Sequence, residues 1–168
     1  MKVTVKQVTP WSRALDAARM TVGKAPLRKE PSDEWKEKML KAEHSPIRLV
    51  EYDIYLEDIP SFVATHLARH HEGCEKFVCS KRDDRGGGNP EEVNRLTPVN
   101  MLITCNAQAL INISRKRLCC QAHAETRAVW RMVKRAIGDI DLIMAKYMVR
   151  ECEYRNGLCP EINSCILK

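Results

Sequence analysis

The sequence predicts a single-domain α+β protein, and three observations support this class. At 168 residues the chain has the length of one domain and can bury a sizeable core. Its composition, with 44% hydrophobic and 30% charged residues, is ordinary for a globular protein. Segments with strand periodicity and segments with helix periodicity follow one another without strict alternation, which favours α+β over repeated βαβ units.

The N-terminal part predicts a strand followed by two helices. Residues 2–8 alternate valine with polar residues, as a half-buried strand does. We expect the next helix to begin with Thr9 as its N-cap and Pro10 at its first position. A second, shorter helix then runs from a Ser32 cap to Lys41.

The middle of the chain predicts two strands around a helix. Residues 48–58 form the clearest strand, because alternate residues make one face apolar: Val50, Tyr52, Ile54 and Leu56. Pro60 begins a helix that we expect to end at Gly73, and residues 75–80 form a shorter strand. Three consecutive glycines and a proline predict that residues 80–97 are a flexible surface loop.

The C-terminal half predicts one strand, three helices and a tail. Residues 97–105 lead into a helix with Asn106 at its start. The next helix breaks at Gly138, and a further helix occupies residues 139–149. Residues 150–168 are expected to be an irregular tail, and the domain comprises all residues from 1 to 168.

Charge and cysteine content limit the classes of partner and site. The net charge of +6 favours anionic partners such as nucleotides. No apolar run is long enough for a bilayer span, and the first ten residues do not resemble a signal peptide, so we expect a cytoplasmic protein with reduced thiols. The tail cysteines lack the close pair typical of zinc sites, so no metal is expected; they are Cys152, Cys159 and Cys165.

Two kinds of side chain point to chemistry. Cys74 and Cys79 follow a histidine- and arginine-rich helix end, where positive neighbours lower a thiol pKa; the alternative is ordinary half-buried cysteines. Arg117 continues an apolar helical stripe and would turn a guanidinium inward. A buried guanidinium needs either a bound anion or an internal partner such as Glu125.

Three segments, in this order and spacing, resemble the flavin-dependent thymidylate synthase (ThyX) family. The first is the strand segment "HSPIRLVEYDIYLED". The second is "LARHHEG", which is similar to the family's Arg-His-Arg signature at a helix end. The third is "NAQALINISRKRLCCQAHAETR", which matches the family's N-A-R-x-L segment and the A-Q-W-E-I-R segment that follows it. The resemblance covers roughly residues 40 to 135.

The resemblance implies an antiparallel sheet flanked by helices, assembled as a homotetramer with sites shared between subunits. It implies FAD as cofactor, with NADPH and methylenetetrahydrofolate, and methylation of a pyrimidine nucleotide such as dUMP. By motif position the cofactor-binding residues are Arg69, His70, His71, Asn106 and Asn112. The substrate-binding residues are His66, Arg69, Cys79, Lys81 and Arg117, and the residues expected to act in catalysis are Arg117 and Cys79.

Two other functions stay open. The chain departs from the family signature at several positions, with His71 in place of an arginine and cysteines in place of two serines, which suggests a non-catalytic relative that binds or sequesters a nucleotide. Direct nucleic-acid binding is disfavoured because aromatic residues are not interleaved with the basic ones. The basic residues considered for it are Lys81, Arg82, Arg85, Arg115 and Lys116.

Overall fold

A computed structural model describes residues 1–82, 84 and 89–165 of the chain. Its elements, in order, are β1 (Lys2–Gln7), α1 (Trp11–Met20), α2 (Asp33–Lys41), the 3-10 helix η1 (Ser45–Leu49), β2 (Glu51–Pro60), α3 (Ser61–Ala68), β3 (Cys74–Val78), the 3-10 helix η3 (Pro90–Glu92), β4 (Pro98–Asn106), α4 (Ala107–Arg117), α5 (Ala124–Ile140), α6 (Leu142–Tyr147) and α7 (Glu151–Tyr154). The predicted α+β class is confirmed.

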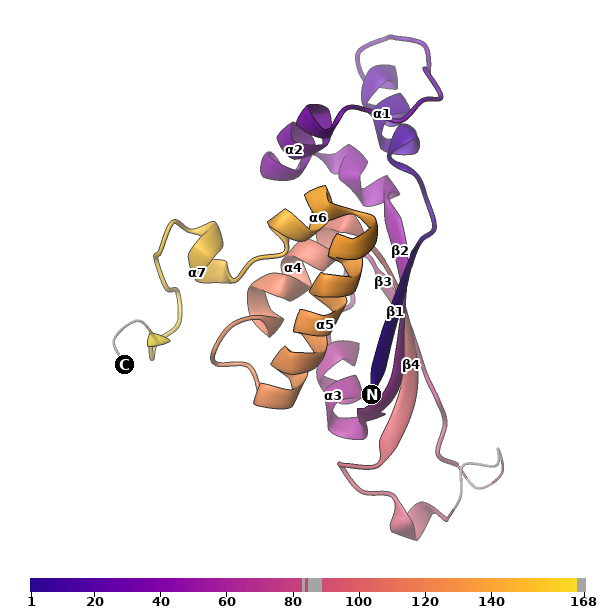
Figure 1. The fold of residues 1–168 in the computed structure, drawn as a ribbon, viewed down its shortest axis with the longest axis vertical. Coiled ribbons are helices and arrows are strands. Elements are labelled where there is room, and N and C mark those ends of the chain that lie inside the picture. The colour runs from indigo at the N-terminus through magenta and orange to yellow at the C-terminus, as the bar shows by residue number, and fades with distance from the viewer. Residues whose placement is uncertain (83, 85–88, 166–168) are drawn as a thin grey trace.

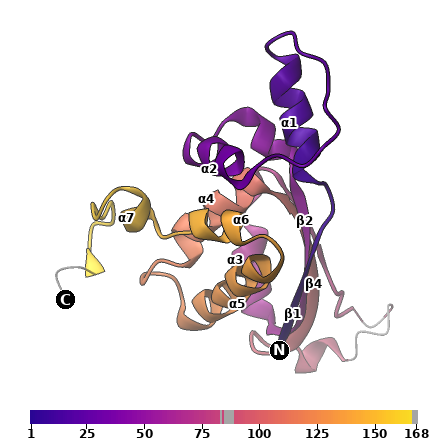
Figure 2. The ribbon, with the colours of Figure 1, turned by 45° about the horizontal axis from the view of Figure 1, so that its top comes forward.

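The four strands form one antiparallel sheet in the order β1-β2-β4-β3. Helices α3, α4, α5 and α6 lie against one face, and no helix covers the other face in the described part of the chain (Figures 1 and 2). The period-2 pattern of β2 explains this layering, because Tyr52, Ile54 and Leu56 are buried toward the helices. Tyr55, on the opposite face, is exposed.

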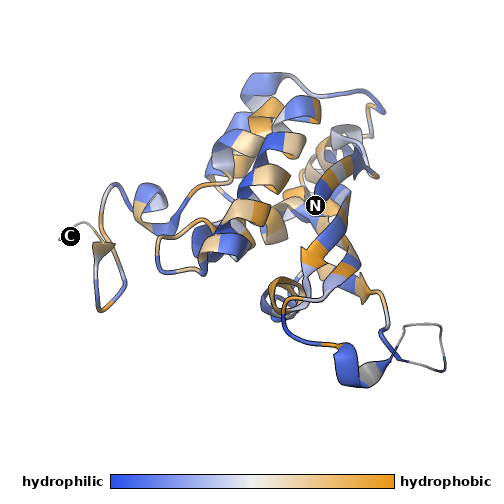
Figure 3. Cartoon of the chain, turned by 60° about the horizontal axis from the view of Figure 1, so that its bottom comes forward, coloured by the Kyte–Doolittle hydropathy of each residue, from blue (hydrophilic) through white to orange (hydrophobic). Residues whose placement is uncertain are grey.

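The core lies between the sheet and the α4–α5 pair. Each of these helices has an apolar stripe facing inward, and most of its charged residues lie outside this stripe, as Figure 3 shows in orange and blue. Leu110 of α4 and Val133 of α5 are fully buried. Trp130 donates its indole N–H to Ser114 Oγ over 2.9 Å, so the two helices are joined by a satisfied buried hydrogen bond as well as by packing.

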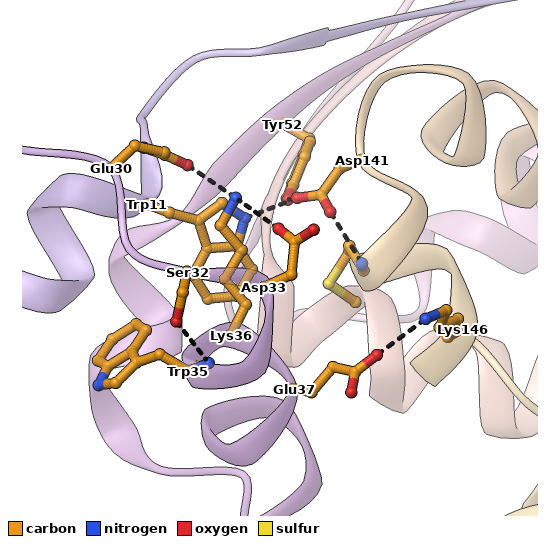
Figure 4. Close-up of polar contacts among 11 residues, drawn as sticks. Trp11, Glu30, Ser32, Asp33, Trp35, Lys36, Glu37, Tyr52, Asp141 and Lys146 are labelled. Atoms are coloured by element: carbon orange, nitrogen blue, oxygen red, sulfur yellow. Dashed lines mark hydrogen bonds and ion pairs between the residues drawn. The ribbon is translucent and has the colours of Figure 1, made fainter.

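A buried carboxylate, Asp141, ties α1 and β2 to the start of α6 (Figure 4). Asp141 Oδ2 accepts hydrogen bonds from Trp11 Nε1 at 2.6 Å and from the Tyr52 hydroxyl at 2.7 Å. Its Oδ1 accepts from the backbone N–H of Met144 at 2.9 Å and caps α6. Burial, and then the Asp141 charge, raise the pKa of Tyr52, which therefore stays a donor.

The expected caps and helix ends were partly right. Ser32 caps α2 by accepting from Trp35 N, and Asn106 caps α4, as predicted. Thr9 does not cap α1; its hydroxyl donates to Glu51 of the neighbouring strand, so Pro10 becomes the cap residue.

Two helix ends differ from the expectation. The helix that begins after Pro60 ends at Ala68, because the chain must turn back to place β3 beside β4. The predicted break at Gly138 is wrong, since α5 continues through it to Ile140.

The loop and tail contain short elements. The expected loop at residues 80–97 contains η3, and residues 83 and 85–88 within it lie outside the described residues. The tail includes α7. None of the described helices is both long enough and apolar enough to cross a bilayer.

Candidate functional site

Two adjoining cavities lie along the N-terminal half of α4 and are called here the α4 cavities. Their volumes are about 710 Å³ and about 360 Å³. Both are within the range of roughly 300–1,000 Å³ that ligand pockets occupy. The larger is lined by Glu43, Arg48, Glu72, Gly73, Asn106, Gln108, Ala109 and Asn112, and the smaller by Arg69, His70, His71, Glu72, Ala109, Asn112 and Ile113.

The wall of the larger cavity depends on a close approach between Gly73 and Asn106. Gly73 adopts a φ of +68°, and its carbonyl accepts from the Asn106 N–H at 3.0 Å. A Cβ at this glycine would lie 2.6 Å from Asn106 Nδ2, so only glycine fits. Asn106 Oδ1 meanwhile accepts from Ala109 N at 2.9 Å, and this capping bond starts α4 beside the cavity.

The five residues predicted to bind cofactor all line the α4 cavities. Arg69, His70 and His71 line the smaller cavity, Asn106 lines the larger one, and Asn112 lines both. They come from two segments that adjoin in space, namely the end of α3 with the turn after it, and α4. The structure therefore brings these residues together as a group.

Arg117 is half-buried, and its hydrogen bonds within the described part of the chain are with neutral groups. Its Nε donates to His70 Nε2 at 2.8 Å, and its Nη2 donates to the His66 carbonyl at 2.7 Å. Burial, and then the nearby Arg69, lower the pKa of Arg117. The internal partner considered from sequence, Glu125, is bound to His123 at 2.7 Å instead. Among the described residues, no carboxylate neutralises this guanidinium.

The two histidines beside Arg117 face different ways. His70 lines the smaller cavity, and burial, and then Arg117, lower the pKa of His70 to about 4. His66 hydrogen-bonds through Nδ1 to Thr126 Oγ1 at 2.9 Å, within the contact between α3 and α5. Burial, and then Arg117, also lower the pKa of His66. His66 thus reaches Arg117 through its backbone only.

Two exposed arginines add positive charge to the cavity walls. Arg48 lines the larger cavity and Arg69 the smaller. Neither has a hydrogen bond or an ion pair within the described part of the chain, so both are available to an anion. Of the two acidic residues, Glu43 is already paired with Arg115, and Glu72 lines both cavities without a hydrogen-bond partner among the described residues. The walls therefore offer an unpaired arginine in each cavity for a negative group, beside one unpaired carboxylate.

Cys79 and Lys81 do not join this group within one chain. Cys79 is exposed and lines a hollow of about 680 Å³ on the face of the sheet that no described helix covers. Its backbone N–H donates to Asn100 O at 2.9 Å, which extends the pairing of β3 with β4. Lys81 follows shortly after and is not among the residues that line this hollow or the α4 cavities.

Positive neighbours were expected to lower the pKa of the thiols after α3, and for Cys74 the direction is confirmed but the main cause is different. The pKa of Cys74 is lowered, but chiefly by a hydrogen bond with the Cys105 thiol directly opposite on β4, with Lys76 a smaller contributor. The same contact, together with burial, raises the pKa of Cys105. Cys74 is 6% exposed, so it belongs to the core behind Gly73 and not to the cavity surface.

The remaining candidates are dispersed. All eight cysteines are free thiols, and no cluster of three or more His, Cys, Asp or Glu side chains in the described ranges could hold a metal ion. Of the basic residues considered for nucleic acid, Arg115 pairs with Glu43 and Arg82 pairs with Asp84. Arg85 lies outside the described residues.

Sequence reasoning missed several residues that line the larger cavity, namely Glu43, Arg48, Glu72, Gly73 and Gln108. Gly73 carried a usable signal, because a glycine between a helix and a strand suggests a left-handed turn. Glu43 had no local signal, since its partners Gln108 and Arg115 are 65 and 72 residues away.

The fold and the cavities together define an α+β protein with two polar cavities beside α4, each lined by one arginine. A solved structure of flavin-dependent thymidylate synthase ThyX from Helicobacter pylori, complexed with FAD and dUMP, matches with a TM-score of 0.72. The identity is 13%, and the match covers 89% of this chain and 100% of that one. The UMP/dUMP methylase PolB from Streptomyces cacaoi, bound with 5-Br dUMP, matches with a TM-score of 0.66 and 14% identity, over 87% of this chain and 94% of that one.

Neither a family model nor a curated protein matches the sequence. The structural likeness nevertheless extends over nearly the whole chain, so the chain has the ThyX fold. The predicted resemblance is confirmed at the level of the fold.

Proposed function

We propose that the chain is a ThyX-like enzyme that binds FAD and a pyrimidine nucleotide such as dUMP and transfers a one-carbon unit to the pyrimidine. The observation that carries this proposal is Arg117, a half-buried guanidinium bonded to His70 and to a carbonyl, with no described carboxylate partner. Such a group is stabilised by an anionic ligand. The comparison structures, which bind FAD, dUMP or a brominated analogue, support the choice of ligand.

The residues of the α4 cavities fit a flavin dinucleotide. Asn112 lies between the two cavities, and Arg48 and Arg69 supply unpaired positive charge for its phosphates. Bound flavin would supply the hydride that completes the methyl group, with methylenetetrahydrofolate as carbon donor and NADPH as electron source. The protein's part is to hold the ligands in position and to balance their charge.

Arg117 would address the nucleotide and stabilise negative charge on its phosphate or ring. Its bond to His70 fixes the direction of the guanidinium before any ligand binds. His66 would support it through its carbonyl. Cys79 would attack the pyrimidine ring, and Lys81 would bind the nucleotide. Because Cys79 lies on the far face of the sheet, both residues would come from another subunit of a homotetramer.

A second function follows from the same separation. The residues proposed to bind the cofactor line the α4 cavities, whereas Cys79 lies on the opposite face of the sheet. A non-catalytic protein that binds or sequesters a nucleotide would need only the first set. Substitution of Cys79 by serine tests the thiol alone: loss of turnover supports attack of the thiol on the ring, and unchanged turnover rules that attack out, whereas a binding protein forms no product with either residue.

The test is a product assay on the purified protein. It is incubated without oxygen with FAD, NADPH, carbon-13-labelled methylenetetrahydrofolate and either dUMP or UMP, and nucleotides are analysed by mass spectrometry. The proposal predicts a labelled 5-methyl product from at least one nucleotide. Nucleotide binding without any labelled product favours the binding protein, and absence of both FAD and nucleotide binding overturns both functions.

A further inference from the structure

A polar wall separates the larger α4 cavity from a third cavity of about 380 Å³, and Glu43 lines both. Glu43 adopts a φ of +48°, in the left-handed region that non-glycine residues rarely occupy. Such a conformation costs about 1–2 kcal/mol and persists where the surroundings hold the residue in place. The backbone at Glu43 is therefore held in a defined turn, from which the side chain reaches this wall.

Arg115 holds the Glu43 carboxylate from the side opposite the larger cavity. Its Nη2 donates to Glu43 Oε1, and the two side chains are 14% and 21% exposed. The Arg115 guanidinium lies 3.7 Å from the centre of the Tyr154 ring, so α7 covers it. Burial acts to raise the pKa of Glu43, but the hydrogen bonds from Gln108 and Arg115 outweigh it and lower the pKa, so the carboxylate stays ionised.

The carboxylate determines which end of the Gln108 amide faces it. An ionised carboxylate only accepts hydrogen bonds, so the group 2.5 Å from Glu43 Oε2 must be the Gln108 NH₂. The same NH₂ donates to Asn112 Oδ1 at 3.3 Å. Asn112 Oδ1 is therefore an acceptor already in use, and its Nδ2 has no partner among the described residues.

We propose that Glu43 is a positioning residue that orients Gln108 and, through it, Asn112, so that Asn112 presents an NH₂ donor to the α4 cavities. The site then selects a ligand group that accepts a hydrogen bond, which means a ring carbonyl or a phosphate oxygen. This inference rests on the proposed function, because it assumes that a ligand enters these cavities. The series of contacts from Arg115 through Glu43 and Gln108 to Asn112 is called the amide relay below.

The amide relay predicts that neutralising Glu43 weakens FAD binding, whereas charge alone predicts the opposite. If only charge mattered, removing a negative charge from the wall would strengthen the binding of an anion such as FAD. Glu72 provides the matched control, because it lines the same cavity and has no hydrogen-bond partner among the described residues. Glu72→Gln should lower the FAD dissociation constant by up to about threefold, as expected for a screened surface charge. Glu43→Gln should raise it about tenfold, the loss of one well-placed hydrogen bond.

An exchange variant removes the charge difference altogether. In the double variant Glu43→Gln, Gln108→Glu the net charge is unchanged, but residue 108 can now only accept, so Asn112 must turn its NH₂ toward it and present Oδ1 to the cavity. FAD binding should again weaken about tenfold. Riboflavin, which lacks phosphate, is titrated in parallel: equal weakening for both ligands assigns the acceptor to the flavin ring, and weakening for FAD alone assigns it to phosphate.

Side-chain NH₂ resonances of the unliganded protein test the relay without a ligand. In the wild type the hydrogens of the Gln108 NH₂ should exchange slowly with water and those of the Asn112 NH₂ quickly. In the double variant the Asn112 NH₂ should exchange slowly instead, because it then donates to residue 108. Melting temperatures of all variants verify folding. Slow Gln108 exchange without any FAD binding refutes the proposed function and leaves the relay intact. Fast exchange at Gln108 in the wild type, or stronger FAD binding by Glu43→Gln, overturns the relay.

Discussion

Arg117 donates a hydrogen bond from Nε to Nε2 of His70 over 2.8 Å. An arginine has no acceptor, so His70 Nε2 must be unprotonated and the imidazole neutral. Burial, and then Arg117, lower the pKa of His70 to about 4, which agrees with this geometry. His70 lines the smaller cavity, so near pH 7 the pair places a neutral imidazole in this wall, bonded to the charged guanidinium of Arg117.

The first prediction concerns stability at mildly acidic pH. The unfolded chain binds a proton at His70 below pH 6.5, whereas the folded chain does so only near pH 4. Stability from this group is present above pH 6.5 and is lost as pH falls toward 4. In His70→Gln, which still accepts from Arg117, unfolding free energy should fall less over this window, by roughly 1 kcal/mol after allowance for solvent screening. Urea unfolding at several pH values measures it, and identical pH profiles would contradict it.

The second prediction concerns the guanidinium itself. Arg117→Lys keeps the charge but cannot donate to His70 and to the His66 carbonyl at once with the same planar geometry. We expect dUMP affinity to fall about 10- to 100-fold, the loss of one charged hydrogen bond. Lys116→Met, an exposed neighbour without a described partner, is the control and should leave affinity within about twofold. Equal affinity of Arg117→Lys and wild type would refute the role.

The third prediction concerns the turn before β3. Gly73→Ala forces a left-handed alanine and brings its Cβ against the Asn106 amide that caps α4. We expect a loss of about 2–3 kcal/mol, from backbone strain and the disturbed cap. Gly23→Ala has a similar φ of +70° but open space around the Cβ, so it should cost only about 1 kcal/mol. Thermal unfolding compares them, and equal losses would mean that the Asn106 contact is unimportant.

The fourth prediction concerns the buried carboxylate. Asp141→Ala leaves the donors of Trp11, Tyr52 and Met144 without an acceptor. The expected loss of stability is about 3–5 kcal/mol, since each buried unsatisfied donor costs about 1–3 kcal/mol. Tyr52→Phe removes a single donor and should cost about 1 kcal/mol. Urea unfolding measures both, and a loss below 1 kcal/mol for Asp141→Ala would contradict the network.

The sequence predicted those parts of the fold that local signals determine. The buried face of β2 followed from its period of 2, and the caps Ser32 and Asn106 followed from residue type and position. The inward Arg117 followed from its place on an apolar stripe. The Trp11–Asp141 bond joins residues 130 apart and had no such signal, because only tertiary packing brings them together.

The same limit applies to the candidate site. Arg69, His70, His71, Asn106 and Asn112 were suggested by motif position, and they do meet around the α4 cavities. The amide relay could not be foreseen, because its ionic partner comes from a distant turn whose shape depends on a left-handed backbone.

Equilibrium titration of the purified apo-protein with FAD, followed by flavin fluorescence, decides whether the α4 cavities bind a flavin. We predict saturable binding with one FAD per chain, weakened at least about tenfold by Asn112→Asp, which replaces the NH₂ donor by a negative acceptor. Absence of saturable binding, or equal affinity of the wild type and Asn112→Asp, would show that these cavities do not hold the flavin.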